Sequence, residues 1–237
     1  RSSMTTDELS LLQMNGRAVL EQLTQVIQHT GYKSTRNSLE GDMFILGPVV
    51  NSRCGGADSV ADTSLFSAIE DNRPNHGDTI GVVYLADDSL KTDCTGADDA
   101  PAACRLSATN PVSRPAAKIY NYFKVDVNAS GMPVLTCSGS LSDTEVEIAE
   151  GVESLQINYG EDADGDGVPD RFVKSTEVTN WGGIVSINIA VLVRSIRPVA
   201  SKAEARSYQL LDEIIPTNDK FLRAVFTTTI RLRNAIS

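Results

Sequence analysis

The stretch GIVSINIAVLVRS, residues 183–195, has the strongest strand pattern of the chain. Five β-branched residues occupy alternate positions in it: Val185, Ile187, Ile189, Val191 and Val193. Side chains alternate between the two faces of a strand, so these five lie together, and Ser186, Asn188 and Ala190 lie on the other face. One face of this strand must therefore be buried against an apolar element.

The N-terminal residues provide that element. Apolar residues recur there at intervals of three or four, or at sums of these: Leu9, Leu12, Leu20, Leu23 and Ile27. Gly31, a common helix terminator, follows them. The spacing predicts an amphipathic helix of about six turns within residues 1–31. A long helix packed on one face of an antiparallel sheet gives an α+β fold.

Alternating patterns predict further strands in the rest of the chain. They span residues 43–47, 79–85, 118–127, 133–137, 145–150, 154–160, 171–175 and 225–234. The segments 48–78 and 86–117 are rich in Gly, Asp, Asn and Pro and are predicted as long loops. Without a repeat or a clear boundary, we expect one domain over residues 1–237, with the helix in 1–31 and a β-rich head in 32–237.

The chain has four cysteines, Cys54, Cys94, Cys104 and Cys137, and none forms a C-x-x-C pair. An even number of cysteines without metal-site spacing favours two disulfides and an extracytoplasmic protein. Such bonds would tie down the long loops, because closing a long loop lowers the entropy of the unfolded chain. The spacing alone does not decide which cysteines pair.

Composition and motifs argue against several functions. The formal net charge of -10 disfavours binding to nucleic acid, whose phosphates this surface would repel. The chain has two histidines, His29 and His76, and no nucleophile-elbow, P-loop, dinucleotide or zinc-protease motif. We therefore expect no catalysis. A secreted calcium-dependent hydrolase with its catalytic residues in the long loops, or an adhesive, lectin-like domain, are the alternatives.

The acidic stretch EDADGDGVPDR, residues 161–171, has the spacing of half a calcium loop. Its expected ligands occupy positions one, three, five, seven and nine of the loop: Asp162, Asp164, Asp166, the main-chain carbonyl of Val168, and Asp170. Gly167 fits the sharp turn at position six, but position twelve is Val173 instead of glutamate. Water or another carboxylate would complete the shell; Glu161 and Glu177 are near in sequence. We predict a structural Ca²⁺ site, with a plain hairpin turn as the alternative.

Four fragments, in this order, resemble the PilW-type minor pilins of bacterial type IV pili. They are NGRAVLEQLTQVIQHTGY (15–32), VESLQINYGEDADGDGVPDRF (152–172), IVSINIAVLVRS (184–195) and FTTTIRLRN (226–234). Asp93-Cys94 and the cysteine after PVLT also fit the family's two-cysteine pattern. That pattern implies a Cys94–Cys137 disulfide and leaves Cys54 for Cys104. The competing connectivity pairs Cys94 with Cys104 and Cys54 with Cys137.

The resemblance implies a type IV pilin-like fold in which residues 1–31 are the C-terminal half of the pilin helix. The family's apolar first half, absent from this sequence, anchors the subunit in the inner membrane, facing the periplasm, before assembly into the extracellular pilus. Such a subunit primes assembly at or near the pilus tip. Its expected partners are other minor pilins, the major pilin and a tip adhesin, and its expected roles are pilus biogenesis, twitching motility and adhesion. A pseudopilin J-like tip subunit of type II secretion is the alternative.

Overall fold

The computed structural model describes residues 2–32, 43–46, 69–71, 73, 76–85, 90–97, 118–142 and 144–234. Most of the two predicted long loops, including Cys54 and Cys104, lies outside these ranges. The predicted Cys54–Cys104 pair therefore falls outside the described residues and stays a prediction.

The chain begins with the predicted helix, α1, which spans Ser2–Ile27. It ends in a turn in which the Gln28 amide donates to the Thr24 carbonyl at 3.0 Å. After the turn, the Gly31 amide donates to the carbonyl of Val83 at 2.9 Å. This bond fixes the C-terminal end of the helix to the neighbouring sheet.

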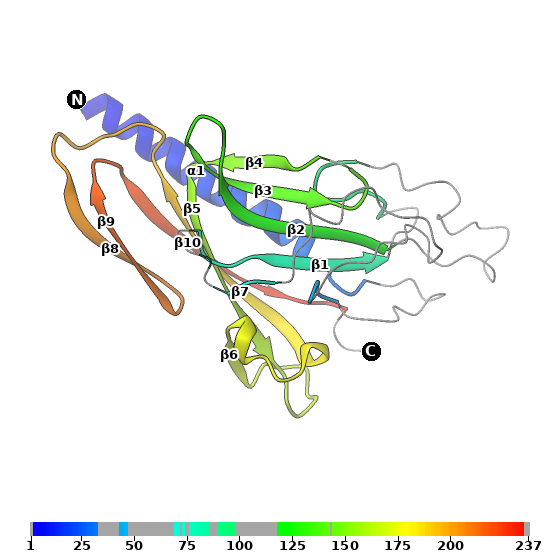
Figure 1. Cartoon of the computed structure of the whole chain (residues 1–237). Coiled ribbons are helices and arrows are strands. Elements are labelled where there is room, and N and C mark those ends of the chain that lie inside the picture. Colours follow the sequence, from blue (N-terminus) through cyan, green and yellow to red (C-terminus); the bar gives the residue numbers. More distant parts are fainter. Residues whose placement is uncertain are drawn as a thin grey trace.

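Within the described residues, the strands form two four-stranded antiparallel sheets and a separate hairpin (Figure 1). The first sheet has the order β1-β2-β3-β4: Ile80–Leu85, Lys118–Val127, Pro133–Gly139 and Val146–Glu150. The second has the order β10-β7-β5-β6: Arg223–Arg231, Ile184–Arg194, Val152–Glu161 and Arg171–Val173. The hairpin consists of β8 (Glu204–Leu210) and β9 (Glu213–Asp219). Two short 3₁₀ turns, Ser175–Glu177 and Trp181–Gly183, lead into β7.

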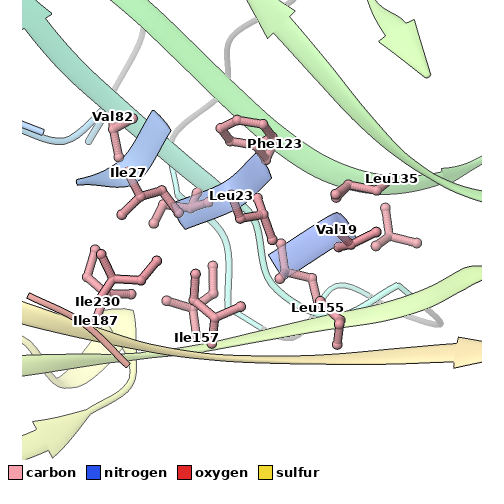
Figure 2. Packing of buried hydrophobic residues seen from close by; sticks show 14 of the residues in the cluster. Val19, Leu23, Ile27, Val82, Phe123, Leu135, Leu155, Ile157, Ile187 and Ile230 are labelled. Carbon is pink, nitrogen blue, oxygen red and sulfur yellow. The ribbon is translucent and has the colours of Figure 1, made fainter. Parts of the chain in front are cut away.

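One apolar face of α1 packs between the two sheets. Figure 2 shows Val19, Leu23 and Ile27 of the helix between Phe123 of the first sheet and Ile187 of the second. All five side chains are fully buried. The predicted α+β class is therefore confirmed, with two sheets on the helix where the sequence suggested one.

The helix also lies against the edge strand β10 at a position that requires glycine. A Cβ atom on Gly16 would lie 2.2 Å from the ring of Phe226, so a larger residue would displace that ring. Further toward the N-terminus the prediction was wrong for Leu9, which is 41% exposed, although Leu12 on the same face is buried. Leu11 and Met14, on the opposite side of the helix, are 44% and 61% exposed.

Sequence reasoning also missed the β8–β9 hairpin, and with it the environment of β7. The predicted apolar face of β7 is buried in the main core, as expected. On the face that we assigned to polar residues, Ala190 and Leu192 are also fully buried, because Leu210 of β8 packs on them. Of the predicted strand 43–47, residues 43–46 are described, and they form only an isolated bridge from Phe44 to Val82.

A group of charged side chains connects this hairpin to the second sheet. Arg223, whose side chain is 4% exposed, donates to Glu153 of β5 at 2.5 Å and to Asp219 of β9 at 2.6 Å. Arg194 lies 3.5 Å from the same glutamate and stacks 4.1 Å from the ring of Phe221. The end of the hairpin is thus held by a network of ion pairs, which compensates for the desolvation of the arginine.

The Cys94–Cys137 disulfide is present, as the two-cysteine pattern predicted. It attaches the segment 90–97 to strand β3 and excludes the alternative pair of Cys94 with Cys104. The same segment is held by Asp93, whose carboxylate accepts the amide of Leu141 at 2.7 Å. The amide of Cys94 donates to the side chain of Asn121 at 2.7 Å.

Candidate metal site

The acidic loop connects β5 to β6 and projects from the side of the second sheet (Figure 1). Glu161 closes β5 and is paired with Arg171, the first residue of β6. The loop is held at both ends, because the amide of Asp162 donates to Gly183 at 2.9 Å and that of Asp170 to Glu161 at 2.9 Å. Its position as a hairpin connection agrees with the sequence pattern.

Asp162 organises the interior of the loop. One of its carboxylate oxygens accepts the amide of Gly165 at 2.7 Å, and the other accepts the amide of Gly167 at 2.8 Å. Both glycines have positive φ angles, 80° and 83°, which side chains disfavour. The hydrogen bond from Gly167, together with the others, lowers the pKa of Asp162 below its usual value. The loop therefore closes around an ionised carboxylate at position one.

Three of the predicted ligands converge. Carboxylate oxygens of Asp162, Asp164 and Asp166 all lie within 4.8 Å of one another, and the last two residues are exposed. Asp170 stands outside this group, since its carboxylate accepts the amide of Ala163 at 2.7 Å across the loop. The Val168 amide donates to Asp166 at 2.8 Å. Three converging carboxylates and a turn with two glycines fit a hard cation, which needs about six to eight oxygens in all.

Glu161 has a different role from the one that its sequence position suggested. Its side chain is 2% exposed and forms an ion pair with Arg171 at 2.7 Å. It also accepts the amide and hydroxyl of Thr179, at 3.1 and 2.5 Å, and the amide of Asn180 at 2.6 Å. Sequence reasoning missed Thr179 and Asn180, which carry no motif and meet this glutamate only through the path of the chain. Glu161 thus joins the hairpin to the segment before β7.

These partners lower the pKa of Glu161 to about 2, with the Thr179 hydroxyl as the main cause. Since the ordinary value is 4.5, the ionised side chain stabilises the fold above about pH 4.5, and this contribution is lost as the pH falls toward 2. We expect Glu161→Gln to lower the thermal midpoint at pH 7 and to weaken its dependence on pH between 5 and 2. Thermal unfolding monitored by circular dichroism across this range measures both.

The matched control is Glu177→Gln, which removes the same charge from an exposed residue of the neighbouring 3₁₀ turn. The thermal midpoint of that variant should equal that of the parent at every pH. If the thermal midpoints of the parent and of Glu161→Gln change with pH in the same way, the assigned role of Glu161 is wrong.

The loop also contacts the far edge of its sheet. A guanidinium nitrogen of Arg231, the last residue of β10, lies 3.4 Å from the carbonyl of Gly167.

Among the described residues, no helix combines the length and the apolar character needed to cross a membrane.

The chain also matches a known family. The model of the family described as Type IV Pilus-assembly protein W, PilW, matches residues 122–234. The resemblance inferred from the sequence is confirmed over these residues. They run from within β2 to just beyond β10, so they contain the acidic loop, the β8–β9 hairpin and both partners of β7.

Among solved structures, a type IV-like pilin from Thermus thermophilus is similar to this chain, with a TM-score of 0.44 and 14% sequence identity. The similarity covers 98% of this chain and 97% of that chain. No curated protein matches the sequence.

Proposed function

We propose that this chain comprises the head and the C-terminal half of the pilin helix of a non-enzymatic minor pilin that helps to prime type IV pilus assembly. The observation that carries the proposal is the PilW match over residues 122–234. The helix α1 packed on the matched strands supports it, because this packing joins the head to the element that enters a pilus in such subunits. Its proposed site is at or near the pilus tip, after an inner-membrane stage on the periplasmic side.

The proposed partners are other minor pilins, the major pilin and a tip adhesin. A subunit of this kind works through surfaces, and the exposed apolar side chains of Leu11 and Met14, one turn apart on α1, provide one. Through assembly, the protein would contribute to twitching motility and adhesion.

Deletion of the gene tests the proposal. We expect at least a tenfold loss of surface pili, counted by electron microscopy, and recovery with the full-length protein. A deletion strain with normal pili and impaired protein secretion would contradict it and favour the pseudopilin alternative.

We further propose that the acidic loop binds Ca²⁺ as a structural ion. Asp162, Asp164 and Asp166 would supply its carboxylates, with the Val168 carbonyl and Asp170 as the remaining predicted ligands. The ion would offset the mutual repulsion of these aspartates. Its role would be to hold the β5–β6 connection in shape.

Titration calorimetry with CaCl₂ tests this site. We expect one ion per chain, and a loss of affinity of at least tenfold in Asp164→Ala and Asp166→Ala. Asp212→Ala, in the turn between β8 and β9, is the matched control and should bind like the parent. Negligible heats in the parent would leave the plain turn as the explanation of the loop.

A further inference from the structure

The register of β10 shows which of its main-chain groups face away from the sheet. Leu232 donates its amide to Val185, and Ser195 donates to Leu222, at 2.9 and 2.7 Å. Even-numbered residues of β10 therefore form the hydrogen-bonded pairs with β7, given the continuous register of the two strands. It follows that the odd-numbered residues Val225, Thr227 and Thr229 direct their amides and carbonyls toward the free edge.

This free edge has no main-chain partner within the part of the chain that the structure describes. Among the described residues, none forms a backbone hydrogen bond with Val225, Thr227 or Thr229 at this edge. The side chains of Thr227 and Thr229 are exposed, and Thr229 donates to Asn188 at 2.7 Å on the outer face. The edge is therefore accessible at Thr227 and Thr229, whereas the side chain of Val225 is partly buried against the cluster of Ala190, Leu192 and Leu210.

Folded proteins protect exposed strand edges, and the other sheet edges here show such protection. The segments around Tyr32 and Met43 bond to the edge of β1. The strand β4 has an irregular register and the acidic residues Glu147 and Glu150, and β6 has only three residues. In the hairpin, β9 contains Pro216 and β8 carries charged residues.

The edge of β10 has none of these devices over its central seven residues. The sequence AVFTTTI, residues 224–230, contains no charge and no proline, and its pairing with β7 shows no bulge. Three residues with unpaired main-chain groups in a regular strand match the requirement for β-strand addition. A long, neutral, regular edge of this kind is a template for pairing with another chain.

We propose that the β10 edge at Val225–Thr229 accepts an extended segment of a neighbouring pilus subunit as an additional strand. This inference rests on the proposed function and specifies one contact of it. The partner segment must present main-chain amides and carbonyls, and small or neutral side chains suit the two exposed threonines. A second copy of this chain is disfavoured as the occupant, since each copy has a net charge of -10.

Thr227→Pro in the full-length protein tests the edge. It removes an amide that points away from β7, so the strand should remain paired, as proline is tolerated at strand edges. We expect a thermal midpoint close to that of the parent and at least a fivefold loss of surface pili in the complemented deletion strain. Thr227→Ala, which keeps the amide, should assemble normally. Normal pili with Thr227→Pro would overturn the inference.

Two controls cover the case in which proline disturbs folding. Thr228→Pro removes an amide that bonds to β7 and should unfold at clearly lower temperature, which calibrates the effect of a lost sheet bond. The double variant Thr227→Lys/Thr229→Lys keeps every amide and places charge on the edge, so it should lose pili while it stays folded. Normal pili in this variant would also overturn the inference.

A photo-crosslinker introduced at Thr229 identifies the occupant. We expect crosslinks to one extended segment of another pilus subunit, lost in the Thr227→Pro background. Crosslinks to a second copy of this chain, or none in piliated cells, would overturn the assignment. Failure of the proposed function itself would show differently, as a deletion strain with normal pili.

Discussion

Replacing Leu23 with alanine is expected to lower the free energy of unfolding by about 3 kcal/mol. The side chain projects from α1 and is fully buried between the two sheets, so its truncation leaves a cavity in the core. Figure 2 shows it at the centre of the packing. Chemical denaturation monitored by circular dichroism measures the loss, and a thermal midpoint lower by about 6–12 °C should accompany it.

The matched control is Leu11→Ala on the same helix. Leu11 is 44% exposed, so the same change should alter stability by less than about 0.5 kcal/mol. Equal losses for the two variants would show that α1 is packed differently from the structure.

Removing the Cys94–Cys137 disulfide is expected to destabilise the protein by about 4 kcal/mol. The bond links residues 43 positions apart, and closing a loop of this length removes much entropy from the unfolded chain. Denaturation of the Cys94→Ala/Cys137→Ala variant under non-reducing conditions measures the effect.

Reducing agent provides the control for this experiment. When both proteins are measured in dithiothreitol, the parent should be nearly as unstable as the variant, because both then lack the 94–137 bond and any bond between Cys54 and Cys104. If the fully reduced parent remains more stable than the variant by several kcal/mol, the loss in the variant comes from the packing around Cys137, which is fully buried.

The fold class could be predicted from local patterns. The spacing of Leu12, Leu23 and Ile27 defined a helix face, and the β-branched run at 184–194 defined a buried strand. The hairpin 204–219 could not be found in this way. Its strands carry mixed polar and apolar residues without a clear alternation, and their burial depends on packing against Ala190 and Leu192 of β7 and Val225 of β10.

The candidate site was predictable to a similar extent. The spacing of Asp162, Asp164 and Asp166 identified a loop whose carboxylates converge, because a turn places alternate residues on one side. The ion pair of Glu161 with Arg171 and its hydrogen bonds to Thr179 and Asn180 required the folded hairpin. Sequence distance alone does not show that these groups meet.

The sequence by itself determined the α+β class, the acidic loop and the resemblance to PilW-type pilins, since each depends on the periodicity or spacing of nearby residues. Only the tertiary structure decided which groups remain without partners. Whether a main-chain amide such as that of Thr227 faces a strand or solvent depends on the register of β10 against β7. That register is set by packing between residues distant in the sequence, and it is what exposes the proposed binding edge.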